Sequence, residues 1–231
     1  MNRMQAILHI HSKDWFWWLL APWCWALLPS FAVNLIISLF AHTDAGIYTG
    51  GLVSIYIYML IIGALVVYRT FSFALGFTMR RTDYILGTTL VAITVCAIEA
   101  IVLLLLSFIE ADLTGGWGVR LHFFHLPYVS DGSFLAQFWV YFIALATLYA
   151  LGFIIGSLYQ RAGRTGLLAT SGAALLLGTI GSFACTQYNW WGNIFAWLTH
   201  QSTADLASWF LLPLVACLSI SYVLLRKATI A

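Results

Sequence analysis

The sequence predicts an all-α polytopic membrane protein with six transmembrane helices, organised as a single domain over residues 1–231. Hydrophobic residues make up 62% of the chain and charged residues 8%, and the mean hydropathy is +0.94. A soluble domain is excluded, because such domains carry roughly 25% charged residues. The apolar residues also fall into runs close to the ~20 residues that a helix needs to cross a bilayer core.

The distribution of lysine and arginine predicts the orientation of these runs. The predicted spans are residues 15–40, 51–68, 84–109, 134–159, 166–185 and 207–225. When the amino terminus is placed in the cytoplasm, nine of the ten lysines and arginines fall in cytoplasmic segments, and Arg120 is the exception. This bias follows the positive-inside rule. We therefore expect a multi-pass protein of the plasma (inner) membrane with both termini cytoplasmic.

The residues before the first span are expected to form an interfacial helix over residues 1–14. Met4, Ile7, Leu8 and His11 recur at helical spacing, which is typical of an amphipathic helix lying on a membrane. The aromatic cluster at residues 15–18 then indicates the headgroup level. Pro22 and Pro29 should kink the first span, because proline removes a backbone donor.

The inner segment over residues 69–83 is rich in aromatic residues. Its apolar side chains group on two helical faces, one with Phe71, Leu75 and Met79 and one with Phe73 and Phe77, and Arg80, Arg81 and Asp83 follow them. A segment that only turned the chain would be polar, with glycine or proline. An apolar helix in the cytosol instead fits a groove on a partner or lies on lipid, and composition alone leaves both open.

This segment resembles the connection between the second and third helices of type-2 ABC transporter permeases (the ABC-2 type). The resemblance rests on the pattern Phe71-x-Phe73-Ala74-Leu75-Gly76, then Arg80-Arg81-Thr82-Asp83-Tyr84 and Leu86-Gly87-Thr88. It implies a coupling helix at residues 69–83 that docks on a separate ATPase subunit. The docking face would be Phe71, Phe73, Leu75, Phe77 and Met79, with Arg80, Arg81 and Asp83 at its rim.

The same resemblance implies the partners and the activity. Two permease chains, as a homodimer or heterodimer, would lie in membrane lipid above two ATPase subunits, and the complex would export an amphipathic, lipid-like, drug or peptide substrate. The chain contains no GxxxxGK[ST] phosphate loop, so ATP and magnesium are expected on the ATPase. We expect no catalytic residue, metal or other cofactor on this chain and no nucleic-acid partner. Asn34, Ser38, Thr179 and Ser182 are candidate pathway residues by analogy with the family.

Two outer segments, residues 110–133 and 186–206, carry further features. The second mixes tryptophans with polar residues, which is typical of re-entrant or surface helices and also of an aromatic belt. In the first, His122 and His125 would need a third ligand such as His42, His200 or Glu110 to bind a metal. That signal is weak, and we expect no metal site.

Glu99 is the single acidic residue within a predicted span. An ionisable group at this depth should face protein or a water-filled cavity, and it is a candidate for the pathway or its gating. Two alternative functions depend on it. One is a proton-coupled secondary transporter, and the other is an intramembrane enzyme using Glu99 with His122, His125 or His200. Gly152 and Gly156 form a GxxxG pattern, which usually serves packing within one chain.

Overall fold

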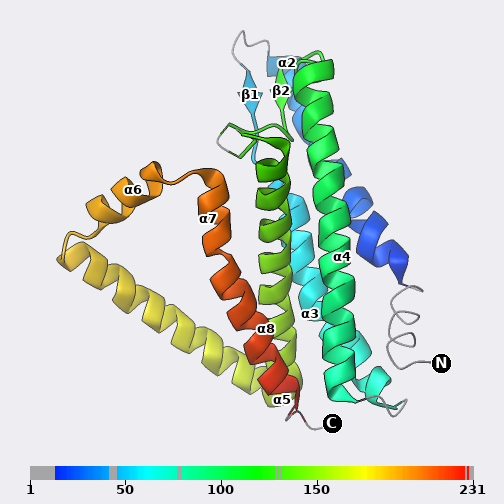
Figure 1. The fold of residues 1–231 in the computed structure, drawn as a ribbon, viewed down its shortest axis with the longest axis vertical. Helices are drawn as coiled ribbons and strands as arrows, with labels where there is room; N and C mark the ends of the chain where they lie inside the picture. The colour runs from blue at the N-terminus through cyan, green and yellow to red at the C-terminus, as the bar shows by residue number, and fades with distance from the viewer. Residues whose placement is uncertain are drawn as a thin grey trace.

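The fold was analysed in a computed structural model, which describes residues 14–41, 46–76, 80–127, 129–130, 132–226 and 228. Figure 1 shows a bundle of long helices with a two-stranded sheet at one end. The helices are η1 (Phe16–Leu20), η2 (Pro22–Leu27), α2 (Leu28–Ala41), α3 (Val53–Gly76), α4 (Arg81–Phe108), η3 (Ile109–Leu113), α5 (Phe134–Gln187), α6 (Trp191–His200), α7 (Thr203–Trp209) and α8 (Leu211–Arg226). The strands are β1 (Ile47–Tyr48) and β2 (Leu121–His122).

Five helical stretches of the described chain are long and apolar enough to cross a membrane. They are Phe16–Ala41, Val53–Gly76, Arg81–Leu113, Phe134–Gln187 and Thr203–Arg226. The expectation of a mostly helical chain with several apolar helices is therefore confirmed at this level. The interfacial helix expected at residues 1–14 lies, apart from Asp14, outside the described residues.

The fifth span predicted from the sequence, residues 166–185, is continuous with the fourth in α5. The helix has one break at Gly163, whose φ of 64° and ψ of −166° lie outside the helical region. This backbone conformation is almost restricted to glycine, because a Cβ would clash with the backbone. Gly163 divides α5 into a first arm, residues 134–162, and a second arm, residues 164–187, which turns back and diverges from the bundle (Figure 1).

The first arm of α5 lies at the centre of the bundle and packs against α3, α4 and α8. Three glycines bring α3 and α5 into backbone contact. A Cβ added at Gly63 would overlap the carbonyl oxygen of Tyr149, and Cβ atoms at Gly152 and Gly156 would overlap the carbonyl oxygens of Leu60 and Ala64. Small residues permit such close approach between membrane helices. The GxxxG pattern therefore serves packing within the chain.

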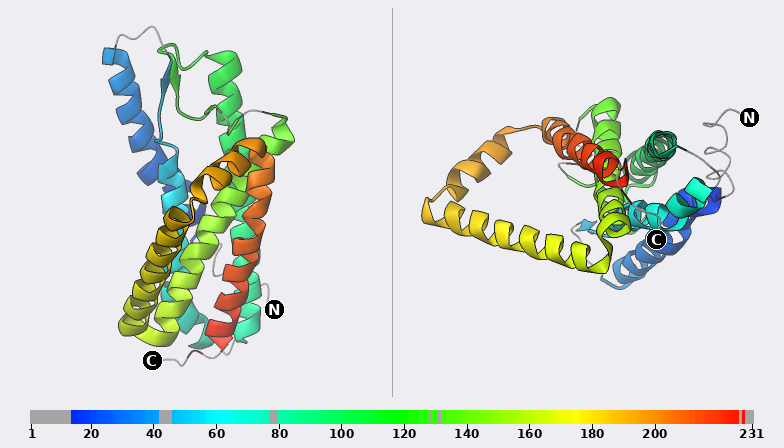
Figure 2. Two further views of the ribbon diagram at one scale, coloured as in Figure 1. Left: turned by 90° about the vertical axis from the view of Figure 1, so that its left-hand side faces the viewer. Right: turned by 90° about the horizontal axis from the view of Figure 1, so that it is seen from below.

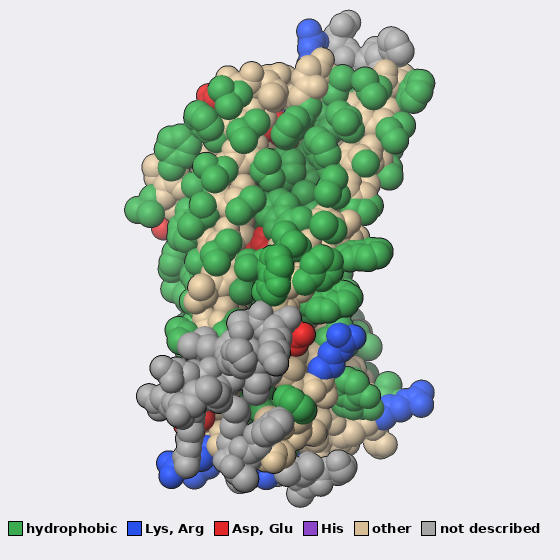
Figure 3. Space-filling model, turned by 90° about the vertical axis from the view of Figure 1, so that its right-hand side faces the viewer, with side chains coloured by type: hydrophobic (Ala, Val, Ile, Leu, Met, Phe, Trp, Pro, Cys, Tyr) green, Lys and Arg blue, Asp and Glu red, His purple; other side chains and the backbone are tan. Residues whose placement is uncertain are grey.

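One end of the bundle carries most of the basic side chains of the described chain. At this basic end α3 ends at Gly76, α4 begins at Arg81, α5 breaks at Gly163 and α8 ends at Arg226 (Figure 1). Figure 3 shows lysine and arginine side chains gathered toward this end, below a broad apolar surface. Arg81 Nη1 donates a hydrogen bond to the carbonyl oxygen of Arg226 at 2.6 Å, which ties α8 to α4.

The opposite end, which we name the cap end, carries β1 and β2. The strands pair in parallel, with Ile47 opposite Leu121 and Tyr48 opposite His122. Figure 2 shows α2 and this sheet at the same end of the molecule. The second arm of α5 and α6 lie apart from the bundle in Figure 1 and in the right-hand view of Figure 2, so the chain leaves the bundle at Gly163 and returns through α7 and α8.

Candidate functional site

The corner between α3 and α4 contains the residues that the sequence assigned to a docking helix. The structure has no separate helix here within the described residues, because α3 continues beyond residue 68 to Gly76 and α4 begins at Arg81. Phe71 is fully buried, and its ring packs edge-on against Tyr84 with centroids 5.4 Å apart. Phe71 therefore belongs to the core of the bundle, whereas the sequence assigned it to a docking face.

The neighbouring residues of the corner differ in exposure. Phe73 is 53% exposed, Leu75 is half-buried, and Arg80 precedes the first turn of α4. Asp83 lies in that first turn, where a negative charge is favoured by the helix dipole. Phe77 and Met79 lie outside the described residues. The described corner thus has an exposed aromatic side chain near the end of α3 and two arginines at the start of α4.

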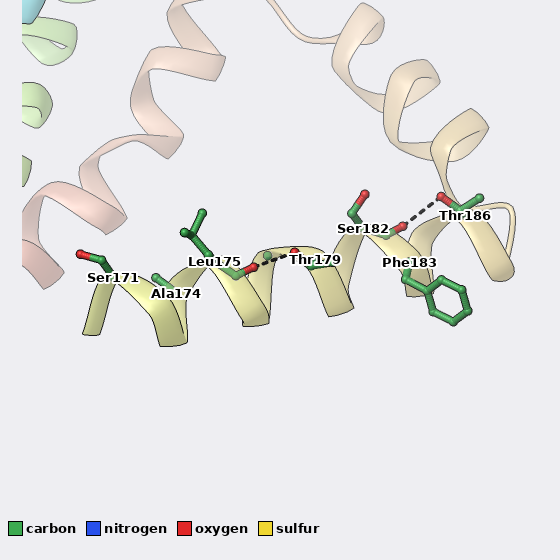
Figure 4. A pocket seen from close by; sticks show the side chains of 8 residues that line it. Ser171, Ala174, Leu175, Thr179, Ser182, Phe183 and Thr186 are labelled. Atoms are coloured by element: carbon green, nitrogen blue, oxygen red, sulfur yellow. Dashed lines mark hydrogen bonds between the residues drawn. The ribbon is translucent and has the colours of Figure 1, made fainter. Parts of the chain in front are cut away.

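The second arm of α5 is exposed along most of its length. Leu175, Leu177 and Phe183 are among its exposed apolar side chains. An open hollow of about 940 Å3 lies along one face of the arm, and Figure 4 shows its lining (Ser171, Ala174, Leu175, Gly178, Thr179, Ser182, Phe183 and Thr186). All of these residues come from one helix, so the described residues supply only one wall of the hollow.

The hydroxyl groups along this hollow fall into two kinds. Thr179 donates to the carbonyl oxygen of Leu175 at 2.9 Å, and Thr186 donates to that of Ser182 at 3.0 Å (Figure 4). Such bonds satisfy a hydroxyl within its own helix. The side chains of Ser171 and Ser182 make no hydrogen bond within the part of the chain that the structure describes, so they are the two hydroxyl groups of this face left for a partner or a ligand.

The other two candidate pathway residues lie on α2. Asn34 donates to the carbonyl oxygen of Ser30 at 2.8 Å, and Ser38 donates to that of Asn34 at 2.8 Å. Helix α2 packs against η2 and β2, whereas Thr179 and Ser182 lie on the diverging arm of α5. A single chain therefore does not bring the two pairs of residues together.

Glu99 faces the interior of the bundle from α4. The residue is 0% exposed, and neither carboxyl oxygen has a hydrogen-bond partner among the described residues. The Trp23 indole lies nearby but does not reach hydrogen-bond geometry. An unpaired carboxylate is costly in such a place, so we expect the neutral, protonated acid.

A second buried acid, Glu110, organises the cap end. Its carboxylate is 0% exposed and accepts three backbone N–H groups, those of Phe123 and His125 on Oε1 at 2.9 and 2.8 Å and that of Phe124 on Oε2 at 3.0 Å. The Trp117 indole donates to Oε2 at 2.7 Å. These four donors hold the loop between η3 and α5 against the end of α4.

A hydroxyl network continues from this loop into the bundle. Ser107 Oγ lies 3.2 Å from His125 Nδ1, and Ser130 Oγ lies 3.1 Å from the Tyr141 hydroxyl. Tyr141 donates to the carbonyl oxygen of Phe124 at 3.0 Å. Sequence reasoning missed both features, because Glu110 was considered only as a metal ligand and the partners of the carboxylate are mostly backbone groups.

The three histidines considered as partners of Glu99 do not lie beside it. His125 contacts Ser107 at the cap end, eight residues or about 12 Å along α4 from Glu99 at ~1.5 Å per residue. His122 stacks on Tyr48 with ring centroids 4.6 Å apart, and His200 lies exposed at the end of α6. No group of three or more metal-binding side chains occurs among the described residues. Comparison with protein-family models, with characterised proteins and with solved structures finds no match.

Proposed function

We propose that the chain is the membrane subunit of an ATP-driven exporter of the type-2 ABC permease class. Two such chains, each with six spans when α5 is counted as two, would enclose a pathway for an amphipathic, lipid-like, drug or peptide substrate. Two separate ATPase subunits would bind ATP and magnesium at the cytoplasmic side. The permease takes no part in the chemistry and acts by binding substrate differently in inward-open and outward-open states.

The observation that carries this proposal is the corner between α3 and α4 at the basic end. The positive-inside rule makes that end cytoplasmic. Phe73 is 53% exposed near the end of α3, and Arg80 and Arg81 lie at the start of α4. An aromatic anchor rimmed by charge fits a groove on a soluble partner. Phe71 of α3 packs against Tyr84 of α4. A movement of the ATPase that displaced Phe73 would therefore move α3 and α4 together.

The exposed second arm supports the need for a second permease chain. Its hollow has one wall of small and hydroxylated side chains, which suits close packing against another helix or a water-filled pathway. We assign Ser182 and Thr179 to this pathway. Asn34 and Ser38 on α2 would reach it only from the partner chain, because within one chain they lie on a different side of the bundle.

The docking proposal is tested by co-expressing the chain with an ATPase encoded in a neighbouring gene and measuring copurification. Phe73→Asp should reduce the retained ATPase at least tenfold, because a carboxylate replaces an anchor residue in an apolar groove. The matched control is Phe134→Asp, which changes a similarly exposed phenylalanine at the cap end and should leave the complex intact. Undiminished binding by the Phe73→Asp variant would contradict the assignment of the corner.

The orientation has its own test in cysteine labelling. In a background lacking Cys24, Cys96, Cys185 and Cys217, a cysteine at Arg164 should be shielded from an impermeant reagent in intact cells, whereas one at Gly118 should react. Arg164 follows the break in α5, and Gly118 belongs to the loop at the cap end. Labelling at Arg164 in intact cells would reverse the proposed topology.

A further inference from the structure

We propose that a hollow between η1 and α3 binds the headgroup of a phospholipid that carries both a phosphate and a primary ammonium group. The hollow has a volume of about 40 Å3. Its lining combines two charged side chains with aromatic and aliphatic ones, namely Asp14, Trp17, Trp18, Ile62, Leu65, Val66, Arg69 and Thr70. The site does not depend on the proposed transport function.

The walls of the hollow are fixed by contacts between the two helices. Tyr58, Ile62, Leu65 and Arg69 follow one another at spacings of three and four residues, so they lie on one face of α3. The Tyr58 hydroxyl donates to the carbonyl oxygen of Trp17 at 2.9 Å. This bond holds the start of the first span against that face, and the hollow is lined from both sides by residues of these two segments.

Among the residues that the structure describes, the two charged side chains of this hollow form no ion pair. Thr70 is already satisfied, because its hydroxyl donates to the carbonyl oxygen of Val66 at 2.7 Å and lies 2.8 Å from the Tyr84 hydroxyl. Arg69 is held over the Trp17 ring, with the guanidinium carbon 6.0 Å from the ring centroid. Within the described part of the chain, the side chains of Asp14 and Arg69 form no salt bridge with each other or with any other residue. The hollow therefore presents a separate anion and cation to a ligand.

A phosphoethanolamine headgroup matches this pair of charges. Its phosphate suits the guanidinium of Arg69, and its ammonium can donate hydrogen bonds to the carboxylate of Asp14. The trimethylated ammonium of phosphocholine has no N–H donor, so it cannot donate a hydrogen bond to Asp14. A phosphoglycerol headgroup would leave Asp14 without a counter-charge and beside a second anion.

The position of the hollow in the membrane fits a headgroup. The first candidate span begins at Phe16, two residues after Asp14, and the tryptophans that follow are typical of the headgroup level. The remaining lining, Ile62, Leu65 and Val66, is aliphatic and lies on α3, a candidate span. Acyl chains could thus follow α3 while the headgroup occupies the hollow.

Native mass spectrometry of the purified, delipidated full chain tests the proposal. Phosphatidylethanolamine, phosphatidylcholine and phosphatidylglycerol with identical acyl chains would be titrated separately, and bound lipid would be measured. The wild-type chain should bind phosphatidylethanolamine about fivefold more tightly than either other lipid, a modest ratio because both charged residues are exposed to solvent.

Two variants separate the roles of the charges. Asp14→Asn should remove the preference for phosphatidylethanolamine while retaining phosphate-dependent binding, and Arg69→Gln should weaken the binding of all three lipids. Arg164→Gln is the matched control, because it removes an arginine from the same end of the molecule away from the hollow. Thermal unfolding of each variant would show that the chain remains folded.

The proposal is overturned if wild type binds the three lipids equally, which would indicate only an unspecific lipid annulus. It is also overturned if phosphatidylglycerol binds best, since Asp14 would then have no part in recognition. A further contrary result is that deleting residues 2–12 creates the lipid preference, because the amino-terminal segment would then be the occupant of the hollow in the intact chain.

Discussion

The two arms of α5 use similar residues in opposite environments. In the first arm, Gly152 and Gly156 lie against the backbone of α3, and a Cβ at either position would overlap a carbonyl oxygen. In the second arm, Gly172 and Gly178 have nothing of the described chain within 4 Å of an added Cβ. Small residues in a membrane helix therefore indicate close packing only where a neighbour is present. In the second arm the described part of the chain supplies no such neighbour, which agrees with the proposed second permease chain.

The largest expected effect is that of a bulky residue at the crossing of α3 and the first arm. Gly152→Leu should prevent native packing, with a loss of about 3 kcal/mol or more, because the added side chain meets backbone that cannot rotate away. Thermal unfolding in detergent measures the loss. The matched change Gly172→Leu should leave stability unchanged or slightly higher, since leucine favours a helix over glycine. An equal loss of stability in both variants would contradict the difference in packing between the two arms.

The cap end should respond strongly as well, because Glu110 belongs to the packed part of the molecule. Glu110→Ala leaves four buried or partly buried donors without their acceptor and should cost about 3 kcal/mol, with Glu110→Gln in between. Unfolding midpoints and protease sensitivity of the loop at residues 114–130 would report the change. Asp112→Ala, two residues away on the same short helix, is the control and should have little effect. A Glu110→Ala variant with the unfolding midpoint and protease sensitivity of wild type would contradict the hydrogen bonds assigned to Glu110.

The second arm should matter for association and much less for folding of the chain. Ser182→Leu should leave the unfolding midpoint near that of wild type but weaken a complex of two chains about tenfold, because a bulky side chain replaces a small contact residue. Disulfide cross-linking of a Ser182→Cys chain in a background without the native cysteines would detect the second copy directly. Gly192→Leu on α6 serves as a control. A Ser182→Leu chain that still pairs normally would exclude this face from the interface.

The smallest effect is expected at Glu99. Glu99→Gln should change stability by less than about 1 kcal/mol, because a protonated glutamate and a glutamine have nearly the same shape and hydrogen-bonding groups. Glu99→Leu is the comparison variant, because leucine lacks the hydrogen-bonding groups that glutamate and glutamine share. A transport assay separates the alternatives. Loss of pH-dependent uptake by the Gln variant without any ATPase requirement would favour a proton-coupled carrier over the ABC permease.

Much of the fold was predictable because hydrocarbon thickness limits the length of apolar runs. The predicted first span, residues 15–40, and last span, residues 207–225, correspond closely to Phe16–Ala41 and Thr203–Arg226. The prediction for α3 ended at residue 68 because Arg69 interrupts the apolar run. Helical hydrogen bonds continue through that arginine, and the packing of Phe71 and Ala74 against the bundle extends the helix to Gly76. Such packing depends on residues distant in sequence.

The candidate sites were less predictable for the same reason. The burial of Phe71 follows from its contact with Tyr84 across the corner, and no local pattern distinguishes it from the exposed Phe73. The role of Glu110 depends largely on three backbone N–H groups, which every residue except proline carries and which leave no trace in composition. The hollow at Arg69 likewise requires the start of the first span to lie on α3.

The break at Gly163 also has a consequence for the degradation of unassembled chains. The excursion through the second arm and α6 is anchored on its return side, where the Trp139 indole donates to Ser208 Oγ at 3.0 Å and Arg81 holds the end of α8. A newly inserted chain could therefore complete its bundle while the serines of the arm still face lipid. Polar groups that remain in lipid are the kind of feature by which membrane quality control recognises unassembled subunits. If two permease chains pair as proposed, lone copies should be degraded rapidly, and their lifetime should increase when the proposed partner is supplied.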